Sequence, residues 1–171
     1  MKKNLQILLL LTLLPFWLTA CGGTSANNYN PKIYGSGSII AVWDLENLSV
    51  TENQILDDMQ EFLSAKVAET LKEQGGYVIV EREKLILALE ELAVGSSALA
   101  SEASRLKVGR MLGAQLMVFG GFQQFGEQLR IDLRLIEVES GAVIRVAEHT
   151  VTASDVATLL SATETAALKL L

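Results

Sequence analysis

Between residues 38 and 80, short apolar runs stand on either side of a long segment with helical spacing. The runs SIIAVWDL (38–45) and YVIV (77–80) are apolar and contain β-branched residues, so both predict buried strands. Between them apolar residues recur every four positions, which predicts a helix with the buried stripe Ile55, Met59, Leu63, Val67 and Leu71. A strand, a helix and a strand in this order predict a βαβ unit with parallel strands and a right-handed crossover.

The two ends of this helix carry their own signals. The tetrapeptide Thr51-Glu52-Asn53-Gln54 has the form of a capping box, in which the first and last side chains bind each other's backbone N–H groups. The pair Gly75-Gly76 ends the helix, because glycine readily adopts the left-handed conformation of a helix C-terminus.

The second half of the chain changes to alternating patterns. After two predicted helices near 82–93 and 102–112, three strands are predicted, with turns at Gly126-Glu127 and Ser140-Gly141: AQLMVFGGFQQ (114–124), LRIDLRLIEVE (129–139) and AVIRVAEHTV (142–151). In the middle strand, apolar residues alternate with Arg130, Asp132 and Arg134. This pattern predicts an antiparallel meander with one packed face and one polar face, to which Arg145 of the last strand is also assigned.

A last helix is predicted from Val156 to Leu170, with Ser154 or Asp155 as its N-cap. The predicted order is therefore β-α-β-α-α-β-β-β-α. This order indicates a single α/β domain over residues 37–171, with a mixed sheet of about five strands covered by helices.

The first twenty residues have the form of a secretory signal. Met1-Lys2-Lys3 is a short positive start, and the apolar run LQILLLLTLLPFWL (5–18) follows it. The stretch from Leu5 to Ala20 is shorter than the ~20 residues that a membrane-spanning helix needs. We therefore predict a signal peptide over 1–20 that is cleaved between Ala20 and Cys21.

Cys21 is the only cysteine of the chain, and its context predicts a lipid anchor. Leu18-Thr19-Ala20-Cys21 resembles the lipobox of bacterial lipoproteins, which implies acylation of the Cys21 thiol and of the new amino terminus. Two or more acyl chains give stable membrane attachment, whereas one gives only marginal binding. In the sorting rule for such lipoproteins, Gly22 directs the protein to the outer membrane, with the domain in the periplasm. The polar, Gly/Asn/Ser-rich segment 21–36 reads as a flexible tether.

The net negative charge of the chain argues against some classes of binding partner. The whole chain carries 14 basic and 20 acidic residues, a formal charge of −6, and loss of Lys2 and Lys3 with the signal leaves 12 basic residues and −8. An acidic protein is a poor ligand for nucleic acid, whose phosphates require a basic surface. We therefore expect no nucleic-acid partner, and membrane contact through the anchor alone.

Residues with catalytic or metal-binding chemistry are scarce. His149 is the only histidine, and its alternation with Arg145 and Ala147 predicts an exposed position on the polar face of the last strand. One histidine and one acylated cysteine make a transition-metal site improbable. The sequence contains no phosphate-binding loop and no Gly-x-Ser-x-Gly elbow, so we expect neither an enzyme nor a cofactor.

Two sets of charged residues are weak candidates for a site. Asp44 and Glu46 follow the first strand, at the carboxyl end where open α/β sheets bind ligands, although a solvated loop is the favoured interpretation of this pair. The polar sheet face with Arg130, Asp132, Arg134 and Arg145 is a candidate partner-contact surface, with an ordinary solvated sheet as the alternative.

Four stretches in order resemble one protein family. IIAVWDLEN (39–47), GGYVIVEREKLILALEEL (75–92), ASRLKVGRMLGAQLMVFGGF (103–122) and LRLIEVESGAVI (133–144) are similar to the successive strands and helices of the CsgG-like lipoproteins, the curli production assembly/transport family. The resemblance covers roughly 39–148. Gln115 and Ser140 depart from the Asp and Thr common in the family, in turns that do not affect the fold.

The resemblance implies an extracytoplasmic domain that works through protein contacts. The best-known branch forms a ring-shaped pore from added β-hairpins, but here the predicted loops are short and leave no spare hairpins. We therefore expect an accessory component of secretion or surface-appendage assembly, with a homo-oligomer as an open possibility. Activation of a peptidoglycan synthase is the alternative, because penicillin-binding-protein activators share this plan of a lipoprotein with one domain. A periplasmic ligand-binding domain or enzyme is a third alternative.

Overall fold

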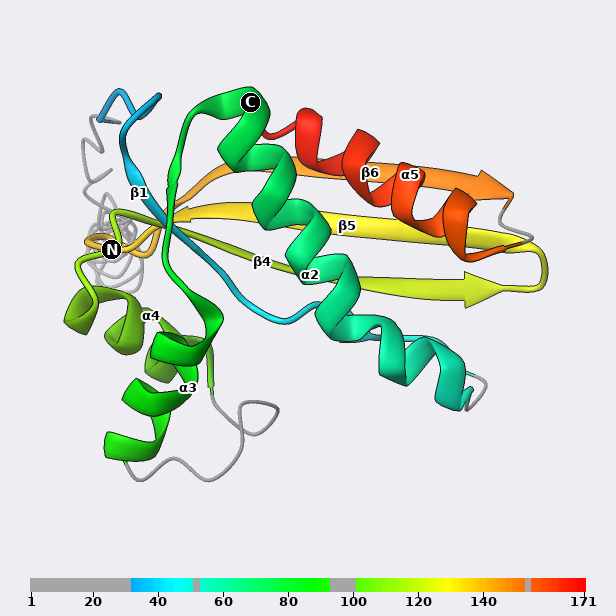
Figure 1. The fold of residues 1–171 in the computed structure, drawn as a ribbon, viewed down its shortest axis with the longest axis horizontal. Coiled ribbons are helices and arrows are strands. Elements are labelled where there is room, and N and C mark those ends of the chain that lie inside the picture. Colours follow the sequence, from blue (N-terminus) through cyan, green and yellow to red (C-terminus); the bar gives the residue numbers. More distant parts are fainter. Residues whose placement is uncertain (1–31, 51–52, 93–100, 153–154) are drawn as a thin grey trace, which may run out of the picture. The chain divides into compact units, whose positions relative to one another are not determined.

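The computed structural model describes residues 32–50, 53–92, 101–152 and 155–171 (Figure 1). Within these ranges, none of the helices combines the length and apolarity needed to cross a bilayer. The elements are, in chain order, β1 (Ile39–Val42), β2 (Glu46–Asn47), α2 (Gln54–Gly75), β3 (Val78–Ile79), α3 (Arg82–Glu91), α4 (Glu102–Met111), β4 (Leu116–Phe125), β5 (Gln128–Glu137), β6 (Val143–Thr152) and α5 (Val156–Leu168).

The strands form one mixed sheet in the order β3-β1-β4-β5-β6. β1 is parallel to both β3 and β4, whereas β4, β5 and β6 form an antiparallel meander. The predicted βαβ unit and the predicted meander are thus both confirmed. The first strand is shorter than predicted, because the chain leaves the sheet after Val42 and returns as β2, which pairs with β4 and brings the sheet to six strands.

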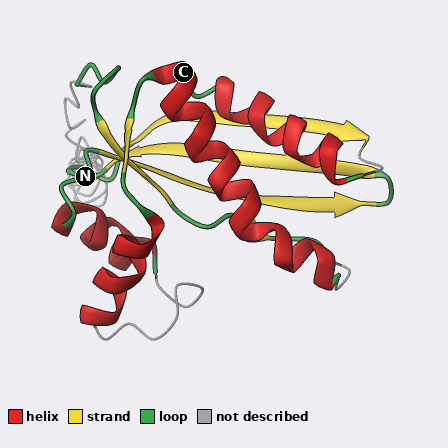
Figure 2. Ribbon diagram, viewed as in Figure 1, coloured by secondary structure: helices red, strands yellow, loops and turns green. Residues whose placement is uncertain are grey.

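Helices α2 and α5 cover one face of the sheet (Figure 2). Their apolar residues pack on the alternating side chains of the meander, which are fully or almost fully buried: Leu129, Ile131, Leu133 and Leu135 from β5, and Ala147 from β6. The alternation of apolar and charged residues along β5 therefore identifies this face as the packed one, as predicted from the sequence.

Helices α3 and α4 pack on the opposite face, at one end of the sheet. Met117 and Phe119 alternate with the residues of the first face along β4, and together with Trp43 they form a second core under the two helices. Arg130, Asp132 and Arg134 of β5 lie on this same face of the sheet. The strands β4, β5 and β6 extend beyond α3 and α4 (Figure 1).

Helix α2 differs in detail from its prediction. Its N-cap is Asn53, whose side-chain oxygen accepts a hydrogen bond from the Ile55 N–H, and not Thr51, which lies outside the described residues. The buried stripe includes Leu56, while Ile55 is 67% exposed, so the assignment of Ile55 to the core was wrong. The C-terminal prediction is confirmed, since Gly76 caps the helix in the left-handed region at φ 67°.

The folded unit begins at Lys32, five residues before the predicted start of the domain at 37. The Tyr34 hydroxyl donates a hydrogen bond of 2.5 Å to Glu137, a carboxylate that is only 3% exposed, and Lys32 forms an ion pair with Glu139. Lys32 and Tyr34, which the prediction placed in the tether, are therefore fastened to the end of β5, while residues 21–31 lie outside the described residues.

Candidate protein-contact surface

The candidate contact face carries a network of charges on the part of the sheet that extends beyond α3 and α4. The Arg130 guanidinium donates to both carboxylate oxygens of Asp132 at 2.8 to 3.0 Å and to Glu148 of the neighbouring strand at 2.9 Å. The hydrogen bonds to Asp132, together with the negative charges of Asp132 and Glu148, raise the pKa of Arg130. The face is therefore polar and internally paired, and it can exchange these contacts for contacts with a protein partner.

Arg134 extends the same face toward α4. Its guanidinium lies 3.5 Å from the carboxylate of Glu102, the first residue of that helix, and both side chains are 47% exposed. An ion pair of this length and exposure is weak, so Arg134 is free to contact a partner at little cost in stability.

Arg145 does not belong to this face, contrary to the prediction. It lies opposite Leu135 in the register of β5 and β6, on the side covered by α5, and donates hydrogen bonds to the backbone carbonyls of Leu170 and Leu171. His149 lies opposite the buried Ile131 and is half-buried on this same side, so its predicted exposed position on the polar face was also wrong. A β-bulge near Leu135 changes the alternation between the two strands, which sequence periodicity alone does not reveal.

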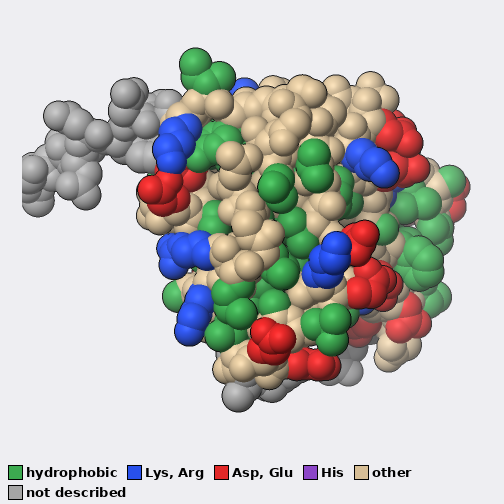
Figure 3. All heavy atoms as spheres, turned by 60° about the vertical axis from the view of Figure 1, so that its left-hand side comes forward, with side chains coloured by type: hydrophobic (Ala, Val, Ile, Leu, Met, Phe, Trp, Pro, Cys, Tyr) green, Lys and Arg blue, Asp and Glu red, His purple; other side chains and the backbone are tan. Residues whose placement is uncertain are grey.

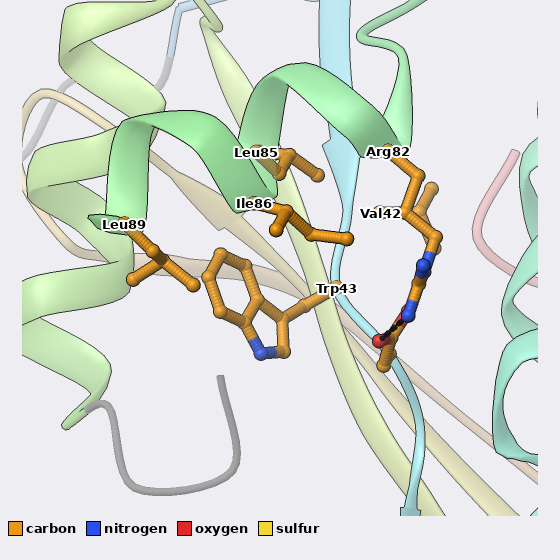
Figure 4. Close-up of a pocket in the computed structure, with 7 residues that line it drawn as sticks. Val42, Trp43, Arg82, Leu85, Ile86 and Leu89 are labelled. Atoms are coloured by element: carbon orange, nitrogen blue, oxygen red, sulfur yellow. Dashed lines mark hydrogen bonds and ion pairs between the residues drawn. The ribbon is translucent and has the colours of Figure 1, made fainter. Parts of the chain in front are cut away.

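Asp44 forms a two-point ion pair with Arg82 at the start of α3 (Figure 4). The Arg82 Nε and Nη2 atoms lie 2.9 and 2.7 Å from the two carboxylate oxygens, and these hydrogen bonds raise the pKa of Arg82. The pair joins α3 to the carboxyl end of β1.

Glu46 holds α4 in a similar way. Its carboxylate accepts a hydrogen bond of 2.7 Å from Arg105, whose side chain is 12% exposed. The Arg105 guanidinium also lies 5.3 Å from the centre of the Trp43 ring and 5.9 Å from that of Phe119. This stacking adds a cation–π attraction to the ion pair.

The Asp44–Glu46 edge thus fastens two helices to the sheet. The adjoining cavity is lined by Val42, Trp43, Asp44, Arg82, Leu85, Ile86 and Leu89 and measures about 10 Å³, which is room for about one water molecule. Both carboxylates have arginine partners, so the geometry supports a structural role for this edge more than a ligand site.

A further concave surface, which the sequence reasoning missed, lies between α2 and α5. One hollow of about 220 Å³ is lined mainly by apolar residues of both helices, among them Ile55 and Val156, and a more open hollow of about 660 Å³ includes Phe62 and Leu160. The signal was present in the sequence, because Phe62 is an aromatic residue of α2 outside the buried stripe.

Ala20 and Cys21 lie outside the described residues, so cleavage between them and lipidation of Cys21 stay predictions. Within the described ranges, no group of three or more His, Cys, Asp or Glu side chains could hold a metal ion. On the face drawn in Figure 3, positive and negative side chains are interspersed with hydrophobic ones.

The sequence matches the family described as curli production assembly/transport component CsgG over residues 36–130, more than half of the chain. The chain belongs to the CsgG family. The matched part contains β1 to β4, the helices between them and the start of β5, which is most of the region whose motifs resembled this family. No curated protein matches the chain by sequence.

Solved structures share the CsgG-family fold of this chain. The LpoB C-terminal domain from Salmonella enterica is 17% identical with a TM-score of 0.61, covering 70% of this chain and 86% of that one. Lipoprotein GNA1162 from Neisseria meningitidis is 15% identical with a TM-score of 0.56, covering 71% and 88%. A PelC dodecamer from Paraburkholderia phytofirmans is 18% identical with a TM-score of 0.54, covering 82% and 94%. At these identities the likeness concerns the fold.

Proposed function

We propose that this CsgG-family chain is an outer-membrane lipoprotein, anchored through an acylated Cys21, whose periplasmic domain assists assembly of a secretion or surface-appendage system of the curli type. Membership in the CsgG family carries this proposal. The domain acts through protein contacts and not by catalysis. Both carboxylates of the Asp44–Glu46 edge have arginine partners, and the adjoining cavity has room for about one water molecule.

The open sheet face with Arg130, Asp132 and Arg134 is the proposed contact surface for this role. Its charged side chains are 35 to 47% exposed and pair mainly with one another and with neighbouring acids. Paired, partly exposed charges of both signs favour recognition of one complementary partner over non-specific binding.

Activation of a peptidoglycan synthase is the second candidate, favoured by the likeness in fold to the LpoB domain. The short length of the tether places this candidate below appendage assembly. Because residues 32–36 belong to the folded unit, only 21–31 can span the distance from the anchor to the domain, at most about 40 Å when fully extended. A synthase activator anchored in the outer membrane has to reach through the cell-wall mesh, which this length makes difficult.

The anchor and the partner are tested separately. Replacing Cys21 with alanine in the full chain should move the protein from the membrane to the soluble fraction or stop its processing. Unchanged attachment and unchanged mass would show that Cys21 is not lipidated. A pull-down of the wild-type chain from solubilised envelopes should recover components of an export or appendage system, whereas recovery of a peptidoglycan synthase would reverse the ranking.

A further inference from the structure

The surface between α2 and α5 has the composition of a binding groove. We name it the α2–α5 groove and define it by Ile55, Met59 and Phe62 on α2 and by Val156, Leu159 and Leu160 on α5. Its floor at one end is Leu129 of β5, which is 2% exposed. The groove therefore lies on the sheet face opposite the open face that carries Arg130.

Large apolar side chains stand exposed along this groove. Ile55 is 67% exposed, Phe62 is 64% exposed and Val156 is 47% exposed. Ile55 and Val156 line the smaller hollow, and Phe62 lines the larger one. Ile55 and Phe62 are seven positions apart on α2, so they lie on the same side of the helix two turns from each other. An exposed apolar stripe that borders a hollow is typical of a site that buries a partner's apolar side chains.

The charges around the groove select the kind of partner. Asp155 lines the hollow next to Val156, and Glu69 and Glu164 line the hollow next to Phe62. Asp58 lies one turn before Phe62 on the same side of α2. The basic residue of the groove, Lys66, lies 3.0 Å from Glu69 and 3.3 Å from Glu164, so two carboxylates already neutralise it. The first twelve residues of α2 and all of α5 contain neither Lys nor Arg.

We infer that the α2–α5 groove binds an amphipathic segment of another envelope protein, with apolar side chains in the two hollows and Lys or Arg side chains facing the acidic rim. Charge complementarity carries the choice of occupant. A second copy placed symmetrically on the groove would bring acidic rims together, and an anionic lipid surface would meet the same repulsion. The inference rests on the proposed function, in that the domain works through protein contacts, and it names a second surface for them.

Photo-crosslinking in the native envelope tests the inference with the full chain. Benzoylphenylalanine, an aromatic photo-reactive residue, replaces Phe62 in one variant and Leu87 in a control. Leu87 is a large apolar residue on α3 that is 59% exposed and lies away from the groove. The expected result is a crosslinked envelope protein at position 62 and none at position 87. Mass spectrometry should map the crosslink to a segment with apolar residues flanked by Lys or Arg.

Other products overturn the inference. A crosslink to a second copy of this chain, to lipid, or to an acidic segment would assign the groove to a different occupant. No crosslink at position 62, or equal crosslinks at both positions, would show that the groove is not a binding site. If the wild-type chain still recovers a partner from solubilised envelopes in that case, the proposed function stands and the groove assignment alone fails.

A charge variant tests the acidic rim. Asp58→Lys, combined with the photo-reactive residue at position 62, should reduce the crosslink yield roughly five-fold, because it places a positive charge beside the partner's basic residues. Glu90→Lys on α3 is the matched control and should leave the yield unchanged; Glu90 is exposed and lies outside the groove. Equal yields from the two variants would contradict the electrostatic part of the inference. Circular dichroism confirms that both variants remain folded.

Discussion

Asp44 and Arg82 meet in a two-point ion pair, at 2.9 and 2.7 Å, that joins the carboxyl end of β1 to the first residue of α3. The two residues are 38 positions apart in the chain. A carboxylate at the carboxyl end of a parallel strand is a common position for a ligand-binding group. Here the tertiary structure uses it to hold a helix, and Glu46 does the same for α4 through Arg105.

Replacing Arg82 with alanine should destabilise the domain modestly. The substitution leaves Asp44, whose side chain is 23% exposed, without this partner. Because the Arg82 side chain is 38% exposed, solvent screens the pair, and we expect a loss of about 1 kcal/mol in the free energy of unfolding. Urea denaturation followed by circular dichroism measures this loss.

The matched control for Arg82 is Lys84→Ala, which removes a pair with Glu81 in which both side chains are more than half exposed. We expect no measurable change in that variant. Equal effects of the two substitutions would mean that the Asp44–Arg82 pair does not help to hold α3.

Asp155 should make helix α5 sensitive to acid. Its carboxylate caps the helix by accepting a hydrogen bond of 2.8 Å from the Thr158 N–H, and this contact lowers the pKa of Asp155 below its ordinary value of 3.8. A lowered folded-state pKa gives stability that is fully present above the unfolded value and is lost as the pH falls through the folded value.

Comparison of Asp155→Ala with the wild type across pH tests this cap. At pH 7 the variant should melt at a lower temperature, and the difference should shrink below pH 3.8 as the wild-type carboxylate takes up a proton. Asp155→Asn keeps a capping oxygen and serves as the control, with little change at pH 7. A difference between Asp155→Ala and wild type that stays constant from pH 7 to pH 2 would contradict an ionised cap.

Gly120 is required by the close approach of β4 and its neighbours. A Cβ at this position would lie 2.4 Å from the Asp132 carbonyl oxygen and 2.7 Å from Cδ2 of Leu133. We therefore expect Gly120→Ala to lower the free energy of unfolding by roughly 1–3 kcal/mol, the usual cost of overpacking. Gly35→Ala is the control, because a Cβ added at that position would meet no neighbouring atom within 4 Å. Thermal melts of both variants are the measurement, and similar melting temperatures would contradict this packing.

Arg134→Glu tests the proposed contact face. The substitution removes a weak pair with Glu102 at 3.5 Å, so stability should change little, but it reverses the charge that the face presents. We expect roughly five-fold lower recovery of the partner from solubilised envelopes. Lys107→Glu makes the same charge change at an exposed position of α4 and should leave recovery unchanged. If both variants recover the partner like the wild type, the open sheet face is not the contact surface.

Local patterns in the sequence predict most of the fold. The alternation of Leu129, Ile131, Leu133 and Leu135 with charged residues identifies the packed face of β5, because side chains of a strand point to opposite sides in turn. The Gly75-Gly76 pair likewise identifies the end of α2, because glycine at position 76 adopts φ 67° without steric cost. Both signals act over a few neighbouring residues, so the sequence displays them directly.

The residues of the candidate contact face could be predicted from the sequence only in part. Arg130, Asp132 and Arg134 lie together as predicted, since they alternate along one strand. Arg145 lies on the other face because a bulge changes the register between β5 and β6, and nothing in the local sequence marks that bulge. Ile55 fits a helical stripe as well as Leu56 does, but the packing of α2 on the sheet buries only Leu56.

The sequence by itself determined the order of elements apart from β2, the parallel and antiparallel halves of the sheet, and the family resemblance, because periodicity and turn residues are local properties. The tertiary structure decided that Asp44 and Glu46 hold α3 and α4, that residues 32–36 join the domain, and that α2 and α5 leave an apolar groove with an acidic rim. These features depend on contacts between residues far apart in the chain. Such contacts exist only after the helices have packed on the sheet.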